Sequence, residues 1–290
     1  MSTALLVYLV VVAGLFGLVI GSFLNVVVYR VPAGIPLTRE SRCPHCDAPV
    51  RWYQNVPVVS WLVLRGKCAN CAAPISARYP LVEAFTGLAF AGIAWWVLGP
   101  FASGVDPSTG SGTGWVPGTG GGLAATGVVL VAYLYFAAVC IALTLIDLDT
   151  HRLPNAIVLP SYVVAIVLFT IACLLGADWW ALARAGIGMA ALYFFYFLLR
   201  LARPDGMGGG DVKLAGVVGL YLGWIGWSTL IVGAFAAFLL GGVFGIILLA
   251  SRKAGRRTAI PFGPWMILGA WTGIFTGEIV GRLYGGLYVS

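Results

Sequence analysis

Charged residues are scarce in this chain of 290 residues. Asp, Glu, Lys and Arg make up only 9% of the residues, and the chain has ten acidic residues in all. Hydrophobic residues make up 60%. A soluble globule of this composition would have too few polar side chains to cover its surface. The composition therefore excludes an ordinary soluble protein, and it predicts an all-α protein that crosses a membrane several times.

Long hydrophobic runs make up most of the chain. A helix needs about 20 apolar residues to cross the hydrocarbon core of a bilayer, and eight runs approach this length. They lie at residues 4–30, 80–99, 123–146, 155–176, 180–200, 212–226, 228–251 and 263–281. The first run lacks the Lys or Arg that precedes the apolar part of a cleaved signal peptide. We therefore interpret all eight as transmembrane helices, of which 212–226 is the shortest.

The basic residues predict how these helices are oriented. Fifteen of the 17 Lys and Arg residues fall in or beside alternate connections, and only Arg184 and Arg282 do not. Short loops rich in Lys and Arg stay on the cytoplasmic side, so both termini should lie outside. The cytoplasmic connections are then residues 31–79, 147–154, 201–212 and 252–262. The net charge of +7 thus reflects membrane topology rather than binding of nucleic acid.

Four of the six cysteines lie in the one polar connection, residues 31–79. They form two Cys-x-x-Cys pairs, Cys43 with Cys46 and Cys68 with Cys71. Two such pairs can present four thiolates to a tetrahedral Zn²⁺ ion. Disulfides are the competing interpretation, which a reducing cytosol disfavours. Four thiolates leave no open position for catalysis, so we expect a structural zinc that supplies folding energy to a small module.

Two polar residues interrupt the apolar runs that flank this module. Asn25 could hydrogen-bond a neighbouring helix or contact a ligand. Glu83 could favour the N-terminus of its helix or face a polar cavity together with Asn25. These two residues are the candidates for cofactor contacts, and the sequence leaves each pair of alternatives open.

Residues 100–122 separate two regions of the chain. The segment is rich in Gly, Ser, Thr and Pro and lacks Lys and Arg, which predicts a flexible loop on the outer side. It has neither the Lys of a P-loop nor a preceding strand, so it is not a phosphate-binding loop. We expect an N-terminal region at residues 1–99 and a six-helix region at residues 123–290.

Two aspartates stand at the ends of apolar runs. Asp147 follows the run 123–146, and Asp211 follows the glycines Gly208, Gly209 and Gly210 and precedes Lys213. At about 100° per residue, Asp147 and Asp149 point about 200° apart, so only one can face the interior, and Asp147 lies nearer the apolar run. The glycines permit positive φ and close approach, and such a loop could carry Asp211 to Asp147. The plain alternative is that these aspartates cap helices or are solvated loop charges.

Two carboxyl groups in contact indicate acid–base chemistry. Like charges at short distance cannot both ionise easily, so such a pair shares one proton. The ionised carboxylate activates a water, while the protonated one polarises the scissile carbonyl and later protonates the leaving amine. A proton-coupled transporter would also use intramembrane acids and glycine-broken helices. It does not account for the four-cysteine module, and the two halves of the chain show no repeat.

The motifs together resemble the bacterial type IV prepilin peptidases, which are GxGD membrane aspartyl proteases. The resemblance rests on Gly21-Ser22-Phe23-Leu24-Asn25 with Tyr29-Arg30, the two Cys-x-x-Cys pairs, Arg78 to Glu83, Asp147 seven residues before Pro154, Gly206 to Lys213, and Pro261-Phe262-Gly263-Pro264. It implies that Asp147 and Asp211 are the catalytic pair of a cytoplasmic (inner) membrane enzyme. The substrates would be type IV prepilins or the pseudopilins of type II secretion, cut after a Gly at the cytoplasmic face of the membrane.

The resemblance also implies a second activity, methylation of the new N-terminus with S-adenosylmethionine. This activity is associated with the cysteine-bearing N-terminal region, and the chain carries no Gly-rich signature of a soluble methyltransferase. Asn155 stands where many relatives have Asp. A peptidase without methyltransferase activity and a scaffold for pilus assembly partners are the remaining alternatives.

Overall fold

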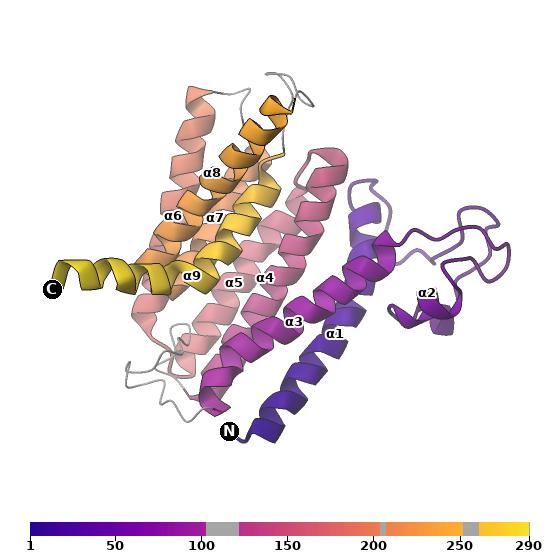
Figure 1. Cartoon of the computed structure of the whole chain (residues 1–290), viewed down its shortest axis with the longest axis horizontal. Helices are drawn as coiled ribbons and strands as arrows, with labels where there is room; N and C mark the ends of the chain where they lie inside the picture. The colour runs from indigo at the N-terminus through magenta and orange to yellow at the C-terminus, as the bar shows by residue number, and fades with distance from the viewer. Residues whose placement is uncertain (103–121, 204–206, 252–260, 290) are drawn as a thin grey trace. The chain divides into compact units, whose positions relative to one another are not determined.

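A computed structural model describes residues 1–102, 122–203, 207–251 and 261–289, and within these ranges the chain is helical, with two isolated β-bridges and no strand (Figure 1). The helices are α1 (Thr3–Arg30), η1 (Trp52–Asn55), α2 (Val59–Val63), α3 (Arg78–Ala102), α4 (Leu123–Thr150), α5 (Asn155–Leu174), α6 (Trp179–Ala202), α7 (Gly209–Ile225), α8 (Trp227–Ala250) and α9 (Gly263–Val289). Each of the eight predicted apolar runs coincides with one of the long helices. Most of the predicted outer loop, Gly206, and the basic cluster at Arg252, Lys253, Arg256 and Arg257 lie outside the described residues.

Within the described residues, six helices are long and apolar enough to cross a membrane: α1, α3, α4, α5, α6 and α8. The prediction of an all-α protein with several membrane-spanning helices is therefore confirmed. Helix α7 has only 17 residues, about 26 Å of helix, and neither it nor α9 is among the six. The run predicted to be the shortest is thus the shortest of the long helices.

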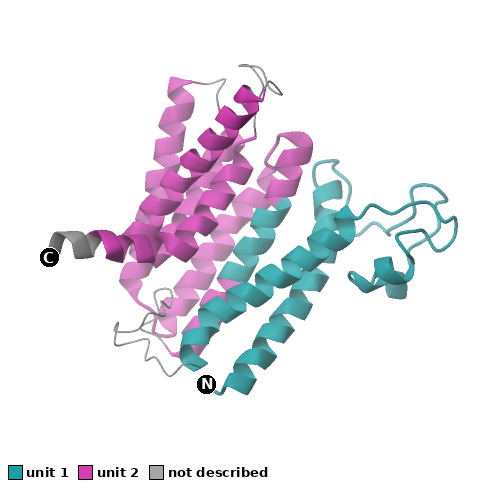
Figure 2. Ribbon diagram, in the orientation of Figure 1, with its two compact units in different colours: residues 1–106, 133–142 teal, residues 107–132, 143–290 magenta. Residues whose placement is uncertain are grey.

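The chain divides into two compact units, coloured separately in Figure 2. Unit 1 comprises residues 1–106 and 133–142, and unit 2 comprises residues 107–132 and 143–290. In unit 1, helices α1 and α3 lie side by side. A Cβ added to Gly21 would stand 2.7 Å from the Cα atom of Glu83, so the two helices touch through their backbones there.

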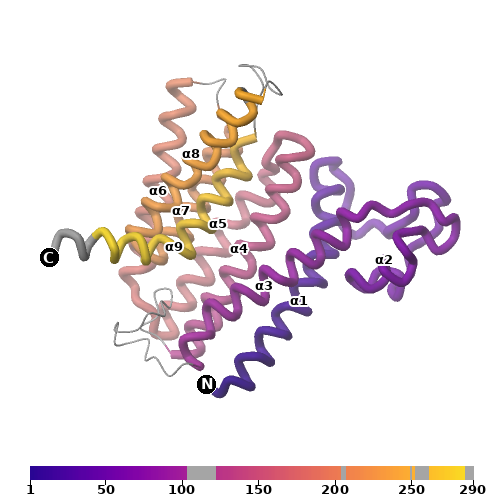
Figure 3. The backbone as a smooth tube through the Cα atoms, viewed as in Figure 1, coloured from indigo at the N-terminus to yellow at the C-terminus, as the bar shows by residue number. Residues whose placement is uncertain are grey.

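The connection from α1 to α3 is tied down by the last residue of α1. Figure 3 traces this connection through η1 and α2. The Arg30 side chain is only 7% exposed and donates hydrogen bonds to the carbonyls of Pro36, Leu37 and Arg39 and to the hydroxyl of Ser41. Buried charged groups are stable only when hydrogen-bonded, so this guanidinium organises the chain as it leaves the helix.

Unit 2 is built around α7, which contacts α5, α6, α8 and α9. Small residues permit the closest contacts: Gly219 of α7 lies against the backbone of Gly188 in α6, and Gly273 of α9 lies against Gly233 in α8. Helices that lack side chains at the contact point can bring their backbones together and gain dispersion energy. At its C-terminus, α7 offers three carbonyls to Arg184, which donates to Gly223, Trp224 and Ile225.

Candidate functional site

The four cysteines of unit 1 lie in two tight turns of the same construction. Each turn is closed by an isolated β-bridge, Arg42 with Pro49 in the first and Lys67 with Pro74 in the second. The Cys43 N–H donates to the Ala48 carbonyl at 2.9 Å, and the Cys68 N–H donates to the Ala73 carbonyl at 2.8 Å. In each turn, the residue after the second cysteine has a positive φ: 55° at Asp47 and 57° at Ala72. The two turns are thus local repeats.

The repeated turns bring the four sulfurs together. The Sγ atoms of Cys43, Cys46, Cys68 and Cys71 all lie within 4.8 Å of one another, and those of Cys43 and Cys71 are 3.9 Å apart. Sulfurs that each lie about 2.3 Å from a tetrahedral zinc are separated by roughly 3.8 Å. The cluster therefore has ligands of the right type and spacing to hold a metal ion, and all four cysteines are free thiols.

Backbone donors prepare one of these thiols for metal binding. The N–H groups of Cys71 and Asn70 point at the Cys68 sulfur and lower the pKa of the Cys68 thiol to about 6. The Asn70 nitrogen lies 3.5 Å from that sulfur. Because thiolates, not thiols, bind metals, this turn favours the ligand form of Cys68.

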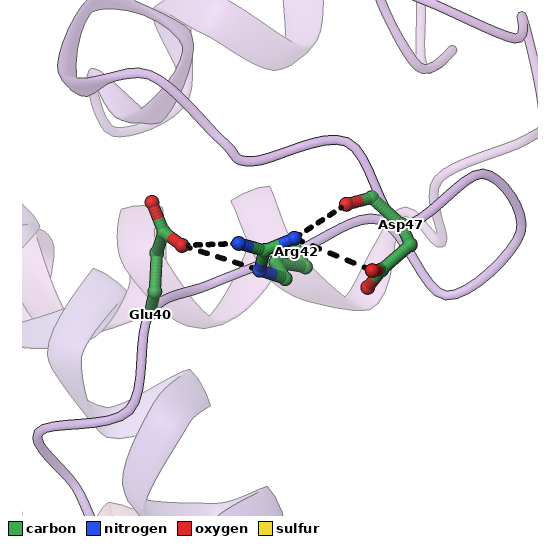
Figure 4. A network of polar contacts seen from close by, with 3 residues as sticks. All are labelled: Glu40, Arg42 and Asp47. Atoms are coloured by element: carbon green, nitrogen blue, oxygen red, sulfur yellow. Dashed lines mark hydrogen bonds and ion pairs between the residues drawn. The ribbon is translucent and has the colours of Figure 1, made fainter.

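A network of polar side chains braces the first turn (Figure 4). The Arg42 guanidinium bridges the carboxylates of Glu40, at 2.9 Å, and Asp47, at 3.3 Å, and it also donates to the Asp47 carbonyl. These groups are exposed, so solvent and salt screen their attraction. Their role is geometric, since they hold Asp47 in its left-handed conformation beside Cys46.

Asn25 and Glu83 both make structural contacts in unit 1. The Asn25 amide nitrogen donates to the Tyr79 carbonyl in the first turn of α3, at 3.2 Å. The Glu83 carboxylate is 8% exposed and accepts from the Val58 N–H at 2.7 Å, at the start of α2. The helix contact considered for Asn25 is thus observed, whereas Glu83 holds the connection between α1 and α3.

In unit 2, Asp147 lies in the last turn of α4 and is buried. Its side chain is 5% exposed, whereas that of Asp149 is exposed, as expected for residues 200° apart on a helix. The Oδ2 atom of Asp147 has no hydrogen-bond partner in the described part of the chain. Gly263 at the start of α9 abuts it, since a Cβ there would stand 2.6 Å from Oδ2. Burying an ionised oxygen without a hydrogen-bond donor costs free energy, so this position suits a protonated carboxyl group or one that binds a further group.

Asp211 lies in the first turn of α7, directly after Gly210, which packs on Leu153; the same leucine lies near Gly263, which abuts Asp147. Its Oδ2 atom accepts from the Gly208 N–H at 3.1 Å. Asp211 is half-buried, and both aspartates belong to unit 2. The structure therefore brings together the two carboxyl groups that the sequence singled out.

The glycines before Asp211 permit close approach rather than an unusual backbone. None of Gly208, Gly209 and Gly210 has a positive φ, and the last two already belong to the first turn of α7. A Cβ at Gly209 would strike the Arg200 guanidinium, and one at Gly210 would stand 2.8 Å from the Cβ of Leu153. Of the two properties that the glycines permit, these three positions thus use close approach, and the helix begins two residues before Asp211.

Lys213 is tied to α5 by two hydrogen bonds. Its amino group donates to the side-chain oxygen of Asn155 at 2.9 Å, and its carbonyl accepts from the Tyr162 hydroxyl. Asn155 therefore serves as an acceptor for Lys213.

Three residues around the aspartates were given no role from the sequence. Leu153 lies between Gly210 and Gly263, Gly263 touches Asp147, and Tyr196 of α6 is buried near Asp211. Gly263 belongs to Pro261-Phe262-Gly263-Pro264, one of the motifs that carry the family resemblance, so the sequence could have indicated a role for it. Leu153 and Tyr196 have no such signal, since they look like ordinary apolar residues in or beside a membrane helix.

Two protein families match separate parts of the chain. Residues 15–97, which include all four clustered cysteines, match the Bacterial Peptidase A24 N-terminal domain. Residues 134–246, which include both aspartates, match the Type IV leader peptidase family. No solved structure matches the chain significantly.

Curated relatives match nearly the full length. Proteins named prepilin leader peptidase/N-methyltransferase are similar to this chain in several bacteria. The one from Neisseria gonorrhoeae is 36% identical and covers 93% of this chain and 91% of the relative. The one from Aeromonas hydrophila is 35% identical, with coverage of 93% and 91%. The one from Stutzerimonas stutzeri is 32% identical, with coverage of 95% and 93%.

Proposed function

This chain belongs to the prepilin leader peptidase/N-methyltransferases, and we propose that it catalyses the reactions of that family. It is a membrane aspartyl endopeptidase that removes the leader of type IV prepilins or related pseudopilins after a Gly. One observation supports Asp147 and Asp211 as the catalytic pair: Leu153 lies against Gly210, the neighbour of Asp211, and near Gly263, which abuts the unpaired Oδ2 atom of Asp147 in the described structure. Such a pair is suited to share one proton.

The pair acts as a general base and a general acid. The ionised carboxylate removes a proton from a water, and the water oxygen bonds to the scissile carbonyl carbon while the protonated carboxyl gives its proton to the carbonyl oxygen. In the second step the carbon–nitrogen bond breaks, the leaving amine takes up a proton, and a hydroxyl proton returns to the pair. Gly208, Gly209 and Gly210 support this geometry by admitting Arg200 and Leu153 beside α7.

The orientation follows from the charges. Asp147 lies in the last turn of α4, five residues before Arg152, and Asp211 lies in the first turn of α7, where Arg200, Arg203 and Lys213 surround the connection. Such connections stay in the cytoplasm, which places both termini outside and the aspartates at the cytoplasmic face of the inner membrane. The enzyme would thus meet the leader before the pilin is exported, with bilayer lipid around its helices.

The four cysteines hold a structural Zn²⁺ ion. The sulfur spacing and the two repeated turns support this assignment, and four thiolates leave no position at which the metal could take part in cleavage. Elemental analysis of purified protein should find about one zinc per chain. Protein with Cys43, Cys46, Cys68 and Cys71 intact but without metal would rule the assignment out.

The second reaction is transfer of a methyl group from S-adenosylmethionine to the new N-terminus. We assign it to the N-terminal region, residues 1–99, and cleavage to residues 123–290, on either side of the outer loop 100–122. Asn25 and Glu83 remain the candidate cofactor contacts, and each also makes one hydrogen bond to the backbone of unit 1. Mass spectrometry of the mature pilin should show a gain of one methyl when S-adenosylmethionine is present, and an unchanged mass would leave a peptidase only.

A cleavage assay in detergent tests the catalytic pair. Wild-type protein should cut a prepilin, whereas Asp147→Asn and Asp211→Asn should each lose activity by several orders of magnitude. Asp149→Asn is the matched control, because it changes a carboxylate two residues away that faces outward. An uncut substrate with the wild type, or full cleavage by either active-site variant, would refute the assignment.

A further inference from the structure

Helices α6 and α7 pack in a regular antiparallel register. Gly223 of α7 lies against the backbone of Arg184 in α6, and Gly219 lies against Gly188. Each step of four residues back along α7 therefore corresponds to a step of four residues forward along α6. Four residues are slightly more than one helical turn, so these contacts follow one stripe on each helix.

Two further steps along this stripe pair Tyr196 with Asp211. The contact beyond this pair supports the register, because the Arg200 guanidinium lies against Gly209 at the start of α7. The phenol thus faces the first turn of α7 at the level of the carboxylate.

The surroundings of Tyr196 fix its ring and leave its hydroxyl unpaired. The side chain is 1% exposed, and the ring packs against Phe238 at 5.5 Å and Phe262 at 6.0 Å. Its hydroxyl has no hydrogen-bond partner among the residues that the structure describes. Phe262 immediately precedes Gly263, which touches Asp147. An unpaired buried hydroxyl costs stability, so its presence beside two carboxyl groups calls for a functional reason.

We propose that Tyr196 is a positioning residue for peptide cleavage, whose hydroxyl donates a hydrogen bond to the Asp211 carboxylate when a prepilin is bound. This inference rests on the proposed function. Asp211 already accepts from the Gly208 N–H, and a second donor would further favour its ionised form. The Oδ2 atom of Asp147 accepts no hydrogen bond in the described structure. The new hydrogen bond would hold the Asp211 carboxylate in one orientation while the pair shares its proton.

Tyr196→Phe removes the hydroxyl and keeps the ring packed between Phe238 and Phe262. The kcat for prepilin cleavage should fall about tenfold or more, because a hydrogen bond to a charged group is lost, while KM should stay within about twofold. The melting temperature should be unchanged or higher, because the variant no longer buries an unpaired hydroxyl. A purely structural hydroxyl would not lower kcat in a protein that is equally or more stable.

Tyr221→Phe is the matched control. Tyr221 is also fully buried, packs edge-on against Phe169 at 5.3 Å, and lies ten residues beyond Asp211, about 15 Å along α7. It should cleave with the kcat of the wild type. Normal kcat in Tyr196→Phe, an equal loss in Tyr221→Phe, or a lower melting temperature in Tyr196→Phe would each overturn the inference. An inactive wild type would instead refute the proposed function.

Discussion

Replacing Gly263 by Ala should disable cleavage without unfolding the protein. The new methyl group would stand 2.6 Å from Asp147 Oδ2 and 3.4 Å from Cγ of the same side chain. A carbon and an oxygen normally stay about 3.3 Å apart, so the carboxyl group or the first turn of α9 must move by about 0.7 Å. Overpacking of this kind typically costs about 1–3 kcal/mol of stability. A displacement near 1 Å at a reacting group can cost about 100-fold in rate.

The assay for Gly263→Ala is the initial rate of prepilin cleavage in detergent, with the melting temperature measured on the same sample. Gly127→Ala is the matched control, since it adds the same methyl group to α4, the helix that carries Asp147, where nothing lies within 4 Å. We expect Gly127→Ala to keep the wild-type rate. Methylation of an already cleaved pilin should persist in both variants. A Gly263→Ala rate above about half that of the wild type would refute the contact on which the reasoning rests.

Three further predictions concern other parts of the molecule. Arg30→Ala removes the donor for three carbonyls in residues 36–39. The α1–α3 connection should then be cut faster by proteases, and an unchanged rate of proteolysis would contradict this. Gly219→Ala has no room against Gly188, and it should lower the melting temperature by about 3–10 °C, whereas Gly242→Ala, which meets nothing within 4 Å, should not. Chelation of the metal should increase hydrogen exchange in residues 42–50 and 67–75 and leave α7 protected; equal exchange with and without chelator would argue against a metal that holds these turns.

The long helices could be predicted because membrane spans depend on one readable property, a run of apolar residues. The run 4–30 became α1, and even the short run 212–226 marked α7 to within a few residues at its start. The pairing of Asp147 with Asp211 was also predictable, since acids in apolar surroundings are rare. The role of Tyr196 was not, because one aromatic residue among Tyr193 to Phe197 looks like its neighbours. Which face of a helix meets which neighbour depends on tertiary packing, which a hydrophobic run does not encode.

The bare contact between Gly188 and Gly219 has a mechanical consequence. No side chain separates the two backbones at that point, so their spacing there sets the angle between α6 and α7. Asp211 lies eight residues from Gly219, which is about 12 Å along the helix axis. A tilt of about 10° would therefore move the carboxylate by about 2 Å, enough to make or break a hydrogen bond. The position of the Asp211 carboxylate therefore depends on how closely the two backbones meet at a contact about 12 Å away.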